Sequence, residues 1–112
     1  MKKFLSGGCD RSISSTCGDK KLKRFVVGDI HGGHKALLQC FERSKFDPQR
    51  DLLISLGDVC DGWPEVSKVI DEFLRIKNLK IILGNHDQWT LRWMTDGWME
   101  DIWTSQGGLA TM

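Results

Sequence analysis

Three short apolar runs recur along the chain, and each ends at a glycine followed by polar residues. The runs are residues 25–27, 52–56 and 79–83. They are short and do not alternate strictly between apolar and polar positions, which is typical of strands buried on both faces of a parallel sheet. We therefore expect each run to form a β-strand.

The stretches between these strands have helical periodicity. The first carries an apolar stripe of Ala36, Leu37, Cys40 and Phe41, before a return loop at Asp47-Pro48. In the second, Pro64 suits a first helical turn, and apolar residues follow at helical spacing: Val66, Val69, Ile70, Phe73 and Leu74. The order β-α-β-α-β predicts an α/β fold with right-handed crossovers and a mostly parallel sheet.

The pattern weakens from Trp89 onward. Trp89 and Trp93 are four residues apart and indicate a short helix, and the glycines at 97, 107 and 108 interrupt the remainder of the chain. All five tryptophans lie between residues 63 and 103. Because this half of the chain is acidic, we expect them to pack in the core or at its rim rather than to bind nucleic acid.

Composition restricts the class of protein. The chain has 112 residues, 40% of them apolar and 28% charged, which is enough for one globular domain. No apolar run approaches the roughly 18 residues that span a membrane. Near the start only Phe4-Leu5 is apolar, too little for a secretory signal, and the four cysteines form no C-x-x-C pair. We expect a cytoplasmic protein with reduced thiols.

The net charge of +1 is unevenly distributed. Residues 1–24 contain seven Lys or Arg and two Asp, whereas residues 25–112 contain nine Lys or Arg and thirteen Asp or Glu. The first part is also rich in Ser and Gly and lacks apolar periodicity, so we expect residues 1–21 to form a disordered basic tail outside the fold.

Residues with metal-binding side chains follow all three strands. Because the carboxyl ends of parallel strands meet at one edge, we expect these residues to converge there: Asp29, His31, Asp58, Asp61, Asn85, His86 and Asp87. Hard or borderline divalent ions prefer such oxygen and imidazole donors. If the chain stays extended through residues 29–31, Asp29 and His31 point to the same side and hold one ion. Asp58 would bridge it to a second ion held by Asn85.

Two bridged ions would serve phosphoester hydrolysis, because they stabilise the attacking and the leaving oxygen together. His86, next to a metal ligand, would then face the leaving group as general acid. Asp61 would hold its imidazole in the correct tautomer.

The three motifs together resemble those of a known superfamily. G-D-x-H-G at 28–32, G-D-x-x-D at 57–61 and G-N-H-D at 84–87 occur in this order in the calcineurin-like metallophosphoesterases. The chain is most similar to the branch of phosphoprotein phosphatases and diadenosine tetraphosphatases. The resemblance runs from about residue 25 to residue 111, because residues 103–111 also match a W-x-x-x-G-G-x-x-T stretch of the family.

This resemblance implies that residues 22–112 form a domain truncated at its C-terminus, the β-α-β-α-β half of a four-layer αββα fold. It implies metal ligands Asp29, His31, Asp58 and Asn85, with His86 and Asp61 as the catalytic pair. Two divalent ions are implied, Mn²⁺ first, with Fe, Zn²⁺, Ni²⁺ and Co²⁺ left open. The implied substrate is a phosphoester on a phosphoprotein, a nucleotide or a small molecule, and a membrane or nucleic-acid partner is disfavoured.

The chain departs from the family in two respects. Gly62-Trp63 follows Asp61 where the family has Arg-Gly, so either another cation such as Arg92 replaces the phosphate-binding arginine or the substrate differs. The family also completes its metal site with histidines further downstream, and of the three histidines here we expect His34 to be a surface or capping residue. The alternative to an enzyme is a non-catalytic half-domain that binds metal or phosphate and self-associates through an exposed sheet edge.

Overall fold

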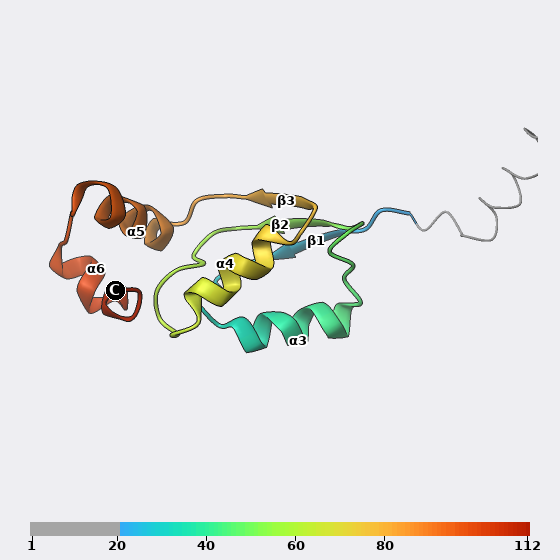
Figure 1. The fold of residues 1–112 in the computed structure, drawn as a ribbon, viewed down its shortest axis with the longest axis horizontal. Helices are drawn as coiled ribbons and strands as arrows, with labels where there is room; N and C mark the ends of the chain where they lie inside the picture. The colour runs from blue at the N-terminus through green and yellow to red at the C-terminus, as the bar shows by residue number, and fades with distance from the viewer. Residues whose placement is uncertain (1–20) are drawn as a thin grey trace, which may run out of the picture.

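The computed structural model describes residues 21–112, so the tail expected at residues 1–21 lies outside the described residues except for Lys21. Eight helices and strands follow one another along the described residues (Figure 1): β1 (Arg24–Val27), α3 (His34–Ser44), β2 (Leu52–Ser55), α4 (Val66–Leu74), β3 (Asn78–Ile81), α5 (Asn85–Asp96), α6 (Asp101–Ser105) and the 3₁₀ helix η2 (Gly108–Ala110).

The three strands form one parallel sheet in the order β1-β2-β3. Phe25 lies beside Leu53, which lies beside Leu79, so the three strands are in register across the sheet. Each strand forms where an apolar run predicts it, with ends that differ by at most two residues. The α/β class and the β-α-β-α-β order are thus confirmed.

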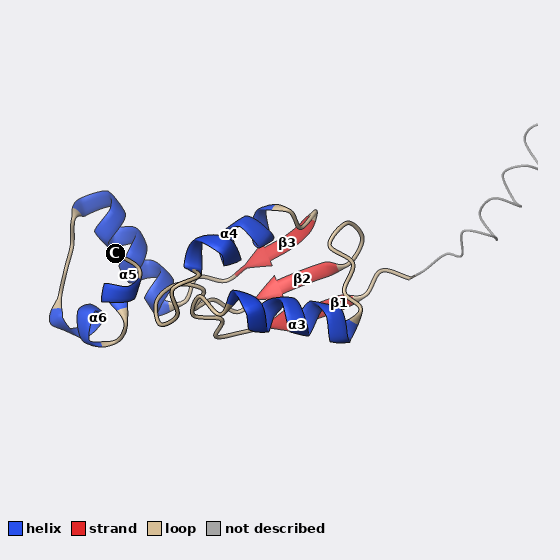
Figure 2. Ribbon diagram, turned by 60° about the horizontal axis from the view of Figure 1, so that its bottom comes forward, coloured by secondary structure: helices blue, strands red, loops and turns tan. Residues whose placement is uncertain are grey.

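Helices α3 and α4 cover the same face of the sheet (Figure 2). Alternate residues of each strand point toward them, so Leu53 is only 1% exposed. Apolar residues from the helices, strands and adjoining loops form the core: Ile30, Leu37, Phe46, Leu53, Val59, Val69, Phe73 and Ile76. The opposite face is not covered by any described residue, and Val26, Leu56 and Ile82 are exposed there.

Helices α5, α6 and η2 lie beyond the carboxyl ends of the strands (Figure 1). The expected short helix around Trp89 is a longer one, α5, which begins inside the third motif at Asn85. Its first turn is stabilised by Asp87, whose Oδ2 accepts a hydrogen bond of 3.1 Å from the backbone N–H of Gly84. This turn is made of polar residues, so apolar periodicity does not reveal it. The helix ends at Asp96 and is capped by Gly97, which has a left-handed conformation.

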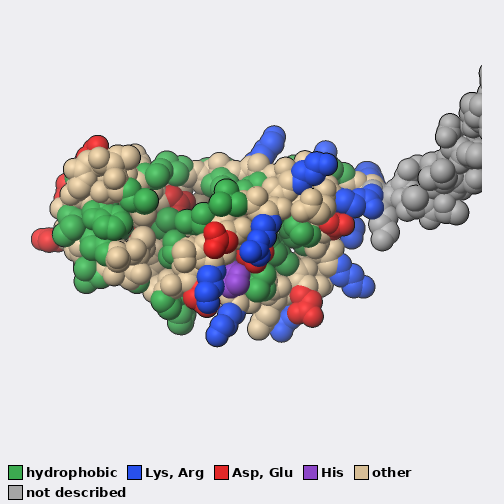
Figure 3. Space-filling model, in the orientation of Figure 1, with side chains coloured by type: hydrophobic (Ala, Val, Ile, Leu, Met, Phe, Trp, Pro, Cys, Tyr) green, Lys and Arg blue, Asp and Glu red, His purple; other side chains and the backbone are tan. Residues whose placement is uncertain are grey.

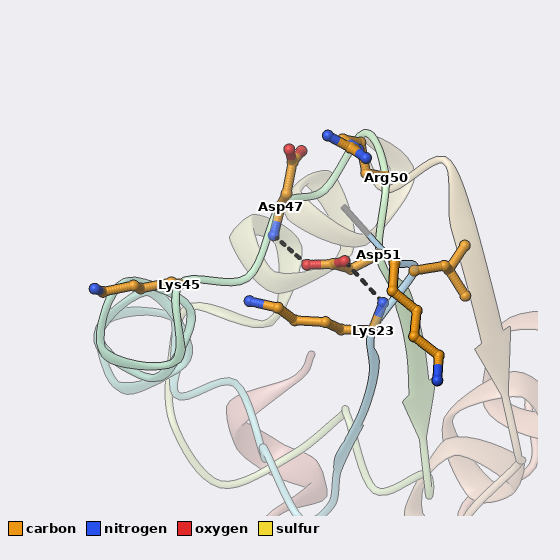
Figure 4. Close-up of a pocket in the computed structure, with 7 residues that line it drawn as sticks. Lys23, Lys45, Asp47, Arg50 and Asp51 are labelled. Atoms are coloured by element: carbon orange, nitrogen blue, oxygen red, sulfur yellow. Dashed lines mark hydrogen bonds between the residues drawn. The ribbon is translucent and has the colours of Figure 1, made fainter. Parts of the chain in front are cut away.

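At the other end of the sheet, Asp51 ties β1 to the loop before β2 (Figure 4). Its carboxylate accepts hydrogen bonds from the backbone N–H groups of Lys23 at 3.2 Å and Asp47 at 3.0 Å. Lys23, Lys45 and Arg50 line a hollow of about 510 Å³ beside it. Figure 3 shows Lys and Arg gathered at this end of the molecule and hydrophobic side chains around α5 and α6. Within residues 21–112, no helix has the length and apolar character needed to cross a membrane.

Candidate active site

The loops after β1 and β2 are joined by backbone hydrogen bonds. The N–H groups of Ile30 and His31 both donate to the carbonyl oxygen of Asp58, at 3.0 and 2.9 Å. In return, the N–H of Trp63 donates to the carbonyl of His31 at 2.8 Å. These contacts fix the first motif against the second, as expected where parallel strands end at one edge.

Three of the predicted ligands meet in this loop pair. The metal-binding atoms of Asp29, His31 and Asp58 all lie within 4.8 Å of one another. Two carboxylates and one imidazole suit a hard or borderline divalent ion. The donor set of this group therefore fits the metal site expected from the sequence.

The backbone reaches this arrangement through left-handed conformations. Asp29, His31, Asp58 and Asp61 have φ angles of 49°, 44°, 53° and 68°. The condition of an extended path through residues 29–31 is therefore not met, and Asp29 and His31 lie together although both have a left-handed backbone. Non-glycine residues rarely adopt this region, and such residues cluster at functional sites.

His31 has the tautomer that a metal ligand needs. Its Nδ1 lies 2.9 Å from the carbonyl oxygen of Cys60. A carbonyl can only accept, so Nδ1 carries the proton and Nε2 keeps a free lone pair. The Cys60 side chain offers no competing thiolate, because burial first and the nearby Asp87 charge second raise the pKa of the thiol to about 12.

The third motif is fixed to the second by side chains. Asp58 Oδ1 accepts a hydrogen bond of 3.2 Å from the N–H of His86, and Asp87 Oδ1 accepts bonds from the N–H groups of Val59 and Cys60 at 2.8 and 3.1 Å. Asn85 is the exposed first residue of α5, so it starts the helix beside these contacts. Asp87, to which the sequence assigns no separate role, thus joins two motifs.

Asp61 and His86 form the expected pair. The Nδ1 of His86 lies 2.9 Å from Asp61 Oδ2, and Asp61 is fully buried. An ionised carboxylate only accepts, so Nδ1–H donates and Nε2 is left for another partner. The His86 ring lies between two others, with its centroid 4.9 Å from that of His31 and 5.0 Å from that of Trp89.

Comparison with known proteins agrees with this geometry. The family model for calcineurin-like phosphoesterases matches residues 22–109. The chain belongs to the calcineurin-like phosphoesterase family. Membership implies divalent metal ions at the site.

Several curated relatives are similar to this member of the family. Serine/threonine-protein phosphatase 1 of Salmonella typhimurium (strain LT2) is 36% identical over 84 residues, and serine/threonine-protein phosphatase 2 of Escherichia coli (strain K12) is 37% identical over 87. Both matches cover 75% of this chain and 38% of the relative. A symmetrical bis(5'-nucleosyl)-tetraphosphatase of Buchnera aphidicola subsp. Schizaphis graminum is 38% identical over 64 residues, covering 56% of this chain and 23% of the relative. The chain thus spans under two fifths of the length of these relatives.

The departure at residue 62 has a structural basis. Gly62 has a φ of 89°, and a Cβ atom there would lie 3.2 Å from the Cβ of His31. An arginine at position 62 would be strained in this backbone.

Arg92, the cation suggested as a substitute for that arginine, has its guanidinium 4.5 Å above the ring of Trp98. The neighbouring Trp63 is 67% exposed, so it is an exception to the packing expected of the tryptophans.

Further residues support the site without being predicted to do so. Trp103 Nε1 donates to Asp61 Oδ2 at 2.8 Å, and Thr111 Oγ1 donates to Asp61 Oδ1. Both belong to the W-x-x-x-G-G-x-x-T stretch, which was the only sequence signal for them. His34 lies outside the Asp29–His31–Asp58 group, with its Nε2 3.6 Å from Glu72 Oε1 on α4.

Proposed function

We propose that this chain carries part of the active site of a metal-dependent phosphoesterase. Asp29, His31 and Asp58 hold one divalent ion, and Asp58 with Asn85 holds a second. The observation that carries the proposal is the convergence of Asp29, His31 and Asp58 within 4.8 Å of one another. Such ions, when bound, acidify a water molecule and offset negative charge on a phosphoryl group.

The proposed chemistry of the protein itself centres on His86. Its Nδ1 is engaged by Asp61, so Nε2 is the atom that delivers a proton to the leaving oxygen. The buried negative charge of Asp61 stabilises the imidazolium that carries this proton. The pair thus lowers the barrier by neutralising the alkoxide as the bond to phosphorus breaks.

We propose Mn²⁺ as the metal, because carboxylate and amide oxygens suit Mn²⁺ and the imidazole of His31 is compatible with it. The substrate class is a phosphoester on a protein, a nucleotide or a smaller molecule. Support comes from relatives named serine/threonine-protein phosphatase and bis(5'-nucleosyl)-tetraphosphatase. The glycine at residue 62 argues for a mode of phosphate binding that does not use a cation at this position.

Replacement of Asp58 tests the metal site. Asp58→Asn removes the charge shared by both proposed ions, so stoichiometric Mn²⁺ binding in equilibrium dialysis should weaken by about 100-fold. Hydrolysis of 4-nitrophenyl phosphate in Mn²⁺ should fall to background. Asp71→Asn, an exposed position on α4, is the matched control and should behave as the wild type.

Unchanged Mn²⁺ binding in the Asp58→Asn protein would refute the proposed metal site. If the wild type neither binds Mn²⁺ nor hydrolyses the ester, the second candidate, a half-domain that acts through protein contacts, is favoured. The observation behind that candidate is the apolar sheet face on which Val26, Leu56 and Ile82 are exposed.

A further inference from the structure

The carboxylate of Asp61 receives more hydrogen bonds than its pairing with His86 requires. Oδ2 accepts from both His86 Nδ1 at 2.9 Å and Trp103 Nε1 at 2.8 Å. Oδ1 accepts from Thr111 Oγ1, while the same hydroxyl accepts a bond of 3.0 Å from the backbone N–H of Asp61. Three side-chain donors, two at Oδ2 and one at Oδ1, therefore hold the carboxylate in one orientation.

Such support matters because Asp61 is fully buried. A buried carboxylate is costly unless donors satisfy it, and hydrogen bonds to a charged group are the strong ones. Thr90 adds little, because its hydroxyl lies 3.5 Å from Asp61 Oδ1 but only 2.9 Å from the carbonyl of His86. Trp103 and Thr111 are therefore the main supports of the carboxylate besides His86.

Both supports come from one segment, residues 103–111, which we call the clamp. Two glycines let it approach closely. A Cβ atom on Gly108 would lie 2.6 Å from the Trp103 ring, and one on Gly107 would lie 3.0 Å from the backbone nitrogen of Gly62. Trp103 is fully buried and packs against Trp93, with ring centroids 5.7 Å apart, so the direction of its N–H is fixed.

We propose that Trp103 and Thr111 are positioning residues for His86. They hold the Asp61 carboxylate in one orientation, and that carboxylate in turn fixes the tautomer and the direction of the His86 ring. The orientation and tautomer of His86 follow from these contacts alone, whereas the expected effect on catalysis rests on the proposed function of His86 as the general acid.

The structural content is tested by NMR of the ¹⁵N-labelled, metal-free chain at about pH 8.5, where an ordinary imidazole is neutral. The chain has three histidines, which simplifies assignment of the ring nitrogens. In the wild type, His86 should show one tautomer with the proton on Nδ1. Thr111→Val keeps the shape but removes the hydroxyl, and should give a mixture of tautomers. Thr111→Ser should restore the single form.

Trp103→Phe removes the indole N–H and should have the same effect as Thr111→Val. Its control is Trp98→Phe, because Trp98 Nε1 donates to Glu100, at 2.9 Å, and not to Asp61. The control for Thr111→Val is Thr95→Val, because the hydroxyl of Thr95 donates to backbone carbonyls of α5 and not to Asp61. If folded Thr111→Val and Trp103→Phe proteins both keep the wild-type His86 tautomer, the proposal is wrong. Should Trp103→Phe fail to fold, Thr111→Val and Thr111→Ser decide it.

The catalytic consequence is measured in Mn²⁺ with two substrates. Thr111→Val should lower kcat about tenfold for phenyl phosphate, whose poor leaving group needs a proton, with KM unchanged. The loss should be smaller for 4-nitrophenyl phosphate. His86→Asn separates the two hypotheses: if it leaves kcat for phenyl phosphate unchanged, the proposed role of His86 fails while the tautomer result stands. An equal loss on both substrates in Thr111→Val would refute positioning through His86.

Discussion

Left-handed backbone conformations place most of the side chains of the candidate site. Among the described non-glycine residues, five have positive φ, and four of these are Asp29, His31, Asp58 and Asp61. Each costs on the order of 1–3 kcal/mol relative to an unstrained residue. The backbone bonds from Ile30 and His31 to Asp58 help to offset this cost, since they form only when both loops turn in this way.

A single methyl group should reveal how tightly the clamp is packed. Gly108→Ala places a Cβ atom 2.6 Å from the buried Trp103 ring, which cannot move aside. We expect the free energy of unfolding to fall by about 1–3 kcal/mol, the usual cost of overpacking. Urea unfolding measures it, with Gly28→Ala as the control, because the atoms nearest to a Cβ there belong to Leu56 at an ordinary contact distance of 3.6 Å. Equal unfolding midpoints for the two variants would contradict the packing described.

The sequence predicted that Asp29, His31 and Asp58 would lie together, but it did not predict that Trp103 and Thr111 would support Asp61. Asp29, His31 and Asp58 follow the ends of strands, and strand ends are read from apolar runs. Trp103 and Thr111 reach Asp61 across 42 and 50 residues of chain. No local pattern encodes such a distant hydrogen bond, so their role required the tertiary structure.

At the level of helices and strands, prediction succeeded where burial imposes a period. α4 has apolar spacing that matches its burial, with Val66, Val69 and Phe73 buried. Prediction underestimated the length of α5, because that helix starts with hydrogen-bonding residues and its apolar positions begin only at Trp89. A helix that begins inside a polar motif has to be inferred from its capping residue, here Asp87.

Asp51 makes the junction between β1 and the loop before β2 sensitive to acid. The hydrogen bond from the Asp47 backbone, then that from Lys23, hold the pKa of Asp51 below its ordinary value of 3.8. A lowered carboxyl pKa stabilises the fold above the unfolded pKa, and this stability is lost as the pH falls through the folded pKa. Asp51→Asn, which can accept only one of the two bonds, should destabilise the protein near neutral pH.

This difference in stability should shrink as the pH falls below 3.8, because the unfolded wild-type chain then binds a proton at Asp51 more readily than the folded protein does. Urea unfolding of both proteins at about pH 7 and about pH 3 measures it. Asp71→Asn is the control, since it lies exposed on α4 and should show no such convergence. A gap between wild type and Asp51→Asn that stays constant with pH would contradict the role assigned to the carboxylate.

At the scale of the whole described molecule, apolar side chains are exposed on the face of the sheet that the helices leave open. Helices α3 and α4 cover the other face, whereas Val26, Leu56 and Ile82 are 61%, 52% and 55% exposed. β3 is also an edge strand among the described residues, with Ile81 half exposed. Contiguous apolar surface of this kind marks a site of association.

The chain should therefore self-associate through this face when studied alone. Sedimentation velocity over a range of concentrations should show an average mass that rises with concentration, and Val26→Lys should suppress the rise by placing a charge in the face. Leu38→Lys, at an exposed apolar position on α3, should not. A chain that stays monomeric at every concentration would count against both this surface and the half-domain hypothesis.

Because Thr111 supports Asp61, warming should disturb the contact between Asp61 and His86 before it unfolds the sheet. Thr111 directly follows η2, a 3₁₀ helix of only three residues, and such short, partly exposed segments open locally at a far lower free energy than the strands of a sheet. Local opening of η2 would remove the Thr111 hydroxyl from the Asp61 carboxylate while β1, β2 and β3 remain intact. Amide hydrogen exchange at residues 108–112 would then report the fraction of molecules whose His86 is correctly held, well before any global melting.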